Sequence, residues 1–470
     1  MKVKKIKDFR ASLNLKLDEN LVALNSGKMA YNFSFSSGAL KGDCPFQPLF
    51  DRYFGGSALG EEILNPEMDL ADGVCVYYER LDQNTLNRDD KLIVVDNNLQ
   101  VFYLNLYGEN RNFVKLGLQF TSMPIAFCYN RYGEDVIIFC SKTDNMVVWN
   151  GVDEPEVVAD APKIKSCVIH NERCFAIVED EPNTLWFSDD LDPTNWSVGL
   201  YDAGFIKLAD DRGRLIRLIS FGGYLYIFRE RGISRLTANG AQEDFYLTHL
   251  FVSSGRILED TITVCGDRII FVATDGVYVF DGANTTRVLE ELGDCLLKNL
   301  NAVGAYFDGK YYLNGKVDFG DDVYNDTNDT SNMIYAYDIS SKEYSFFRGL
   351  DVIDLAVVVS GEYNTLVVLT NKGLYCVSDT PSEFYSGYTS GLYDFGNPKV
   401  KKVVRKISAY VKNNDDVTIE LYNEKNVSKI YKLKNATNSF PVMFEGSAIG
   451  YKIRCKNGAN ITNLEIGISG

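Results

Sequence analysis

The sequence predicts an all-β protein: a β-propeller of about seven blades, with six as the alternative count, preceded by an extended N-terminal arm and followed by a C-terminal β-sandwich. Three observations lead to this prediction. A strand–turn–strand unit recurs about every 46 residues, close to the length of a propeller blade. Tyr (29), Phe (28) and Gly (38) are abundant and Pro (11) is scarce, which favours strands and glycine turns. The end of the chain breaks into short alternating runs.

Residues 1–65 fit neither repeat pattern. They hold few regular hydrophobic runs and many Gly, Asn and Ser, so we expect an irregular arm that packs on the propeller or on a neighbouring molecule. The basic start, MKVKKIK, lacks the apolar segment of a secretory signal. No covalent staple is evident for the ring, so we expect a strand of this arm to pair with the last blade near residues 366–377 and close it.

Residues 66–380 are predicted to form the propeller. The repeated unit is clearest in GDRIIFVATDGVYVFDG (residues 266–282), where two strands flank the turn TDG and Gly276 is expected at positive φ. Gly373 holds the same place in the last unit. A lone hairpin is only marginally stable in water, so the units must stack. The first strands of the seven hairpins begin near Leu92, Val136, Cys174, Tyr224, Arg268, Lys310 and Leu366.

A further apolar run precedes most hairpins, as in KIKSCVIH and VIDLAVVVS, and we expect each to be the innermost strand of a four-stranded blade. Stacking the blades in a ring then buries both faces of each. Residues 69–105 leave the blade count open, because they form either a full blade or part of another. A β-solenoid would need a shorter and stricter period, and a sandwich chain would lack this single recurring hairpin.

The tail differs in composition. Residues 381–398 are rich in Ser, Gly, Tyr and Asp and are expected to form a connector. Residues 399–470 contain six short alternating runs, enough for a small antiparallel sandwich. These runs are VRKISAYV, VTIELYN, SKIYKLK, SFPVMF, YKIRCK and ITNLEIGI.

The chain is strongly acidic, with a net charge of −16 and a pI of about 4.8. A specific binder of the phosphate backbone would instead carry a clustered basic face. Two basic segments occur, KVKKIK at residues 2–7 and KVKKVVRK at residues 399–406. We interpret both as solvated lysines of edge strands, which discourage edge-to-edge pairing. No apolar run reaches the length of a membrane span.

The sequence assigns no catalytic, cofactor or metal residues, and we do not expect an enzyme. The ten cysteines are spread without a CxxC, which favours buried thiols in a reducing compartment, and the only histidines are His170 and His249. No phosphate-binding, zinc-protease or nucleophile motif occurs. The acidic insertion at residues 318–332 offers oxygens for Ca²⁺ without EF-hand spacing, and a solvated loop is the competing interpretation. SDDLDPTNW (residues 188–196) is loosely similar to the Asp-box turn of sialidase propellers, but it lacks the glycine and occurs once.

Three segments within residues 185–288 resemble the propeller of bacteriophage tail and neck proteins. They carry a W-x-S-D-x-x-D-P-T-x-W turn, the hairpin G-x-L-Y-I-F-R-E-R-G-I and the hairpin D-G-V-Y-x-F-D-G, in this order. The end of the chain, YKIRCKNGANITNLEIGISG, is similar to the closing strands of the C-terminal β-domain of those proteins. The layout of arm, propeller and sandwich resembles the tail-hub or nozzle proteins of short-tailed phages, also called packaged-DNA stabilisation proteins.

This resemblance implies a structural virion protein. It implies a homo-oligomeric ring, expected to hold six copies, around the DNA exit channel, in contact with the portal or head–tail adaptor and other tail proteins. DNA would pass through the ring without specific binding, with no membrane insertion, no cofactor and no catalytic residues. The chain would be made in the host cytoplasm and reside in the virion. The alternatives are a phage adhesin whose propeller recognises a ligand on the host surface, and a cellular scaffold propeller.

Overall fold

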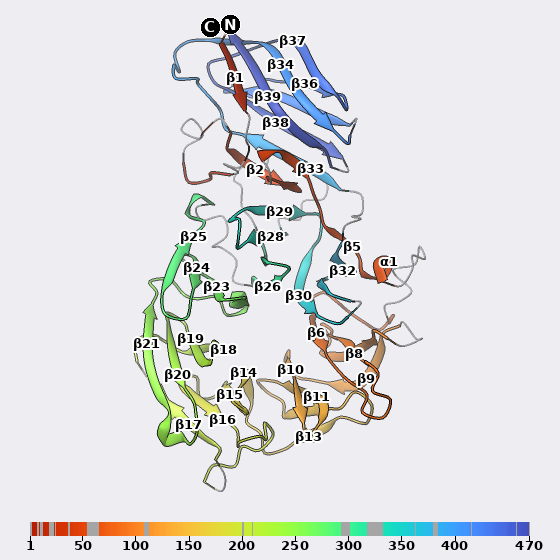
Figure 1. The fold of residues 1–470 in the computed structure, drawn as a ribbon, viewed down its shortest axis with the longest axis vertical. Helices are drawn as coiled ribbons and strands as arrows, with labels where there is room; N and C mark the ends of the chain where they lie inside the picture. Colours follow the sequence, from red (N-terminus) through yellow and green to blue (C-terminus); the bar gives the residue numbers. More distant parts are fainter. Residues whose placement is uncertain are drawn as a thin grey trace.

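A computed structural model of the chain describes residues 2–469 except for fifteen gaps. The gaps are residues 7–8, 10–12, 18–22, 24, 36–37, 54–64, 108–111, 200–201, 209, 293–300, 317–331, 362, 379–383 and the single positions 415 and 457. The described residues form a ring of seven four-stranded antiparallel sheets and, at one end of the long axis of the molecule, two further packed sheets (Figure 1). The predicted propeller with a C-terminal sandwich is confirmed.

Six blades are built from four consecutive strands each. Blade 1 holds β6 (Val74–Tyr78), β7 (Lys91–Val95), β8 (Gln100–Asn105) and β9 (Val114–Gln119); blade 2 holds β10 (Ile125–Arg131), β11 (Glu134–Cys140), β12 (Met146–Trp149) and β13 (Glu156–Val158). Blade 3 holds β14 (Ile164–His170), β15 (Arg173–Val178), β16 (Thr184–Phe187) and β17 (Gly204–Lys207); blade 4 holds β18 (Leu215–Phe221), β19 (Tyr224–Arg229), β20 (Gly232–Thr237) and β21 (Tyr246–Val252). Blade 5 holds β22 (Thr263–Cys265), β23 (Arg268–Ala273), β24 (Gly276–Phe280) and β25 (Thr285–Val288); blade 6 holds β26 (Gly304–Phe307), β27 (Lys310–Lys316), β28 (Asn332–Asp338) and β29 (Tyr344–Arg348). Short 3-10 helices lie at Gln242–Asp244, Glu259–Thr261 and Glu290–Leu292.

The predicted hairpins are the second and third strands of the blades. All residues of β7 and β15 are buried, because a second strand is covered on both faces by the neighbouring blades. The apolar runs before the hairpins are the first strands, which contact the first strands of adjacent blades around the centre of the ring. Residues 74–119 form a full blade, so the count is seven.

Blade 7 closes the ring with a strand from the opposite end of the chain. It consists of β30 (Val352–Val358), β31 (Thr365–Thr370), β32 (Gly373–Val377) and β5 (Phe46–Pro48). The strand β5 pairs antiparallel with β32, with Gln47 opposite Cys376. The expected closure of the last blade by an N-terminal strand is confirmed.

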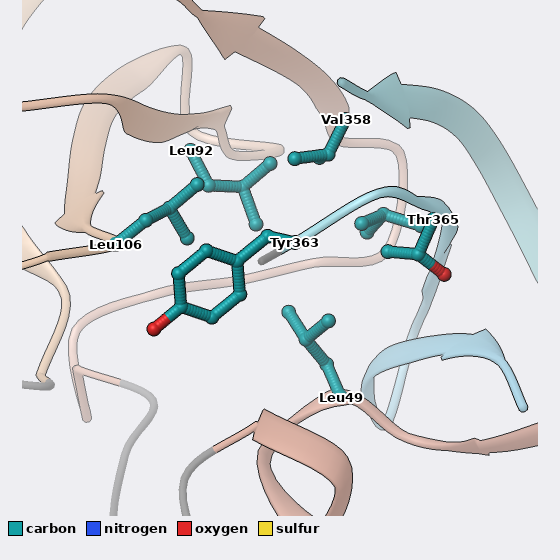
Figure 2. A pocket seen from close by; sticks show the side chains of 7 residues that line it. Leu49, Leu92, Leu106, Val358, Tyr363 and Thr365 are labelled. Atoms are coloured by element: carbon teal, nitrogen blue, oxygen red, sulfur yellow. The ribbon is translucent and has the colours of Figure 1, made fainter. Parts of the chain in front are cut away.

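The seam between blades 7 and 1 is apolar where the short helix α1 (Leu49–Tyr53) covers it. Figure 2 shows Leu49 of α1 facing Leu92, Leu106, Val358 and Tyr363 around a space of about 10 Å³. A space with such apolar walls lacks the polar partners that an ordered water needs. The space is therefore part of the core and does not form a binding site.

The sandwich takes strands from both ends of the chain (Figure 1). One sheet has the order β3 (Phe33–Ser34), β4 (Leu40–Gly42), β39 (Asn460–Ser469), β34 (Lys402–Lys412) and β37 (Thr437–Gly446), with β1 (Lys2–Ile6) also paired to β39. The other has the order β2 (Gly27–Tyr31), β33 (Tyr385–Ser390), β38 (Ile449–Lys456), β35 (Val417–Asn423) and β36 (Ser428–Leu433).

Several expectations about this region are corrected. The described N-terminal residues do not form an irregular arm: they contribute four strands to the sandwich and one to blade 7, each paired with a strand already in the sheet or with another N-terminal strand. Residues 385–390, expected in a connector, are β33. The edge-strand interpretation holds for β1 but is wrong for residues 399–406, because β34 lies between β39 and β37.

Sandwich and propeller share one core. Tyr388 and Ile407 of the sandwich belong to the same cluster of buried side chains as Tyr311 and Tyr335 of blade 6. The N-terminal segment also bonds to the propeller: the Tyr344 hydroxyl of blade 6 donates a hydrogen bond of 3.1 Å to the backbone oxygen of Leu13. The two parts are thus continuous in packing.

One glycine prediction is wrong and one is confirmed. Gly373 has a φ of +140°, in the region that favours glycine. Gly276 does not adopt a positive φ, because it pairs with Ala273 as the first residue of β24, and the turn consists of Thr274 and Asp275 alone. In the described part of the chain, no helix is long and apolar enough to span a bilayer.

Candidate functional site

A cavity of about 660 Å³ lies at one mouth of the central channel of the propeller. First strands from six blades line it, namely β6, β10, β14, β18, β26 and β30, together with the segment that precedes β22 in the remaining blade. Every blade therefore contributes to the wall. This position, where several elements converge, is typical of ligand sites.

Charged side chains from different blades meet across this mouth. Lys165 of β14 pairs with Glu259 of blade 5, with 3.0 Å between Nζ and Oε2. Arg217 of β18 pairs with Asp260, with 3.4 Å between Nη1 and Oδ1. Both pairs are partly exposed, so each contributes little to stability by itself.

Three of the first strands are irregular at the same level. Register shifts occur between Ile164 and Ser166 in β14, between Leu215 and Arg217 in β18, and between Val352 and Asp354 in β30. A β-bulge redirects side chains, and bulges are common at the rims of closed sheets. Here they bring adjacent residues of one strand, such as Ile353 and Asp354, to the cavity wall together.

Asp354 is the carboxylate at the seam of the ring. Its Oδ2 accepts a hydrogen bond of 2.7 Å from the backbone N–H of Cys75, so it links blade 7 to blade 1. Burial raises the pKa of Asp354 to about 7; the hydrogen bond from Cys75 and the charge of Arg217 lower it, and the charge of Asp260 raises it. A carboxyl that titrates near neutral pH in a cavity is a common feature of functional sites.

The arrangement is suited to holding a small polar molecule. Two ion pairs and one proton-exchanging carboxyl surround the space, whereas burial raises the pKa of the Cys75 thiol well above its usual range and so opposes a thiolate there. Within the described residues, no three His, Cys, Asp or Glu side chains are grouped so that they could hold a metal ion.

A second cavity, of about 510 Å³, is lined by the segment that follows β6, by the end of β10, by Asp135 of β11 and by Arg88. Beside it, the fully buried carboxylate of Asp90 accepts hydrogen bonds from the hydroxyls of Tyr77 and Ser360 and pairs with Arg88 at 3.1 Å. Ser360 follows β30, so this network joins blade 1 to blade 7. The polar groups of this network therefore bond to one another across the seam where the ring closes.

The sequence-derived candidates do not gather at either cavity. In the turn at residues 188–196, Asn195 donates to Asp189 at 3.0 Å, Thr194 donates to Asp192 at 2.6 Å, and Trp196 is buried, so the polar groups hold the turn itself. The acidic insertion lies outside the described residues apart from Asn332, which begins β28.

Neither histidine lines either of these cavities, whereas Cys75 and Cys140 line the first cavity and Cys128 lines the second. His170 shares a hydrogen bond with Ser220, and His249 shares one with Ser234. Most of the described cysteines are free and buried, as the sequence suggested; Cys128 is exposed and Cys167 is half-buried.

Sequence reasoning missed Lys165, Arg217 and Asp354. A signal was present: a charged residue interrupts the apolar first strand near its start in KIKSCVIH, RLIRLISF and VIDLAVVVS. Such a residue would face the channel rather than the space between blades.

No protein-family model and no curated protein matches the chain. Among solved structures, the chain is similar to a streptogramin B lyase, with 7% identity and a TM-score of 0.45 over 67% of this chain and 95% of that one. It is also similar to BBS1N from a complex with ARL6DN, with 8% identity and a TM-score of 0.43 over 66% of this chain and 93% of that one. Raptor from Chaetomium thermophilum has 9% identity and a TM-score of 0.46, but the match spans only 29% of its length. At such identities the likeness concerns the fold alone.

Proposed function

We propose that the protein is a non-enzymatic structural subunit of a bacteriophage tail or neck. In this proposal, copies of the chain, expected to number six, form a nozzle or tail-hub ring around the DNA exit channel. The ring retains packaged DNA and conducts it at ejection. Its partners are other copies of the chain, the portal or head–tail adaptor, and neighbouring tail proteins, and its location is the virion.

The observation that carries the proposal is the resemblance of residues 185–288 to phage tail propellers. These residues run from β16 to β25, so the three similar segments belong to the consecutive blades 3, 4 and 5. The similar C-terminal segment forms most of β38 and all of β39 in the sandwich. The resemblance therefore covers blades 4 and 5, the second half of blade 3 and two consecutive strands of the sandwich, β38 and β39.

The rigidity of the chain supports the same proposal. A ring that holds DNA under pressure needs subunits that do not flex between domains. The shared core and the N-terminal strands tie the sandwich to the propeller. A heterologous contact between such rigid subunits closes into a ring when its rotation fits.

One observation favours the alternative, a receptor-binding propeller. The cavity at the channel mouth is polar, open and large enough for a small ligand such as a sugar unit of a host surface glycan. In that case the ion pairs of Lys165 and Arg217 would orient the ligand.

A phage that lacks this chain separates the two proposals. For a nozzle we expect particles that package DNA and then lose it, because an unplugged exit lets pressurised duplex escape. The measurement is the ratio of full to empty heads in electron micrographs of the null mutant. Full, stable heads that fail to adsorb to cells would contradict the nozzle and favour the adhesin.

A further inference from the structure

The two parts of the molecule carry opposite charge. Residues 51–398, which hold all of the propeller except β5, contain 27 Lys and Arg against 54 Asp and Glu. Residues 1–50 and 399–470, which supply all sandwich strands except β33, contain 21 Lys and Arg against 10 Asp and Glu. The net charges are thus −27 and +11, and the basic part lies at one end of the long axis (Figure 1).

Part of this basic charge lies on the outer face of the sheet that contains β34. Along β34, Ile407, Ala409 and Val411 point into the core and are buried. The alternate residues therefore face outward, and among them Lys406 and Lys412 are exposed. A register shift between Val404 and Lys406 leaves the neighbouring Arg405 exposed as well, so the bulge adds a third cation.

The neighbouring strands extend this face. Lys5 of β1 and Ser408 of β34 both pair with Glu465 of β39. These three residues therefore lie side by side on neighbouring strands of the sheet. Lys5 is exposed and pairs with Glu465 at 2.5 Å. The two basic segments, about 400 residues apart in the sequence, therefore share one sheet. On the other side, Thr437 and Ser439 of β37 are exposed beside Tyr410 and Ser408.

We propose that this cationic face, formed by Lys5, Arg405, Lys406, Ser408, Tyr410, Lys412, Thr437 and Ser439, binds the phosphate backbone of duplex DNA without sequence preference. Lysine, arginine and hydroxyl side chains are the groups that contact phosphates. The cores of protein–protein interfaces are instead depleted of charge and enriched in aromatic residues. Lys406 and Lys412 lie about 20 Å apart along the strand, at roughly 3.4 Å per residue. That length spans about six phosphates of one DNA strand.

The acidic propeller determines which end of the molecule DNA can approach. A duplex that approaches the molecule is repelled by the propeller and attracted to the sandwich, so only the sandwich end is favoured. The choice of DNA among polyanions rests on the proposed function, whereas the cationic face itself does not. Binding by the purified chain is measured without phage, so its failure is distinct from failure of the nozzle proposal.

The test uses the full chain and a fluorescein-labelled duplex of mixed sequence, about 24 base pairs long, in anisotropy titrations at about 50 and 200 mM salt. The charge-reversal variant is Lys406→Glu with Lys412→Glu. The matched control is Lys342→Glu with Lys372→Glu, two exposed propeller lysines that give the same change in net charge.

For the wild-type chain and the control variant we expect binding that weakens about 40-fold between the two salt concentrations, as for three phosphate contacts. For the face variant we expect at least tenfold weaker binding at low salt and a salt slope smaller by about two. Absent binding by the wild-type chain, or equal binding by both variants, would overturn the proposal. A face variant that binds DNA normally but sediments differently would overturn it too, and would assign the face to contacts between copies of the chain.

Discussion

At the scale of single residues, Asn32 joins three parts of the chain. It is buried, with a φ of +53°, and its amide donates to the backbone oxygens of Arg348 and Tyr385 at 3.1 and 2.8 Å. Its side-chain oxygen accepts from the N–H of Arg348 at 2.9 Å. One side chain thus bonds the N-terminal segment to blade 6 and to β33.

Replacing Asn32 by Ala should lower the free energy of unfolding by roughly 2–4 kcal/mol, because buried backbone groups lose their partners. The control is Asn413→Ala, at an exposed asparagine with a φ of +69°, which carries the same backbone strain without the buried bonds. Denaturant midpoints of both variants measure the difference. Equal losses would mean that backbone strain alone explains the role of Asn32.

Asp354 should make stability fall as pH rises toward neutral. The pKa of Asp354 in the folded chain is about 7, whereas the pKa of an aspartate in an unfolded chain is about 3.9. Between these values the folded chain keeps a proton that the unfolded chain has released, so the free energy of unfolding decreases with pH up to about 7. Asp354→Asn keeps an acceptor for the Cys75 N–H and removes this titration. We expect wild type to lose stability relative to the variant between about pH 5 and 7, measured by denaturant unfolding. Parallel pH profiles would contradict the assignment.

At the scale of elements, closure of the ring depends on the three-residue strand β5. Phe46 is 3% exposed and meets the ring of Phe347 edge-to-face, with centroids 5.6 Å apart. It fills the space between blades 6 and 7 as well as holding β5 in place.

Phe46→Ala should therefore destabilise the chain by about 3–5 kcal/mol, the range for a buried aromatic. It should also speed proteolysis within residues 43–48, because the pairing of β5 with β32 is weakened. The control Phe205→Ala removes a 38% exposed phenylalanine from the fourth strand of blade 3 and should cost about 1 kcal/mol or less. Unchanged proteolysis within residues 43–48 in the Phe46 variant would show that Phe46 does not hold β5 in place.

At the scale of the whole molecule, the shared core predicts one cooperative unit. The cluster that contains Tyr388 and Ile407 of the sandwich also includes Tyr335 and Tyr311 of blade 6. We expect a single transition in calorimetry of the full chain. Two resolved transitions would contradict the continuity of the core.

The sequence by itself determined the blades. Each hairpin joins neighbours in the chain, so alternation of apolar residues and a turn residue are enough to predict it, as at residues 268–280. The charged residues that interrupt the first strands were a signal for the channel, but the sequence analysis missed it. The bulges at Lys165, Ile216 and Ile353 explain how these residues reach the mouth of the channel.

Tertiary structure alone decided which distant strands pair. Alternation in β1, β5 or β33 says which face of a strand is buried, but it does not identify a partner hundreds of residues away; that choice depends on which sheet edge is left open once the local hairpins have formed. For the same reason the sequence could not show that Lys5 and Lys406 lie on one sheet. The cationic face exists only because β39 pairs with the first strand of the chain on one side and with β34 on the other.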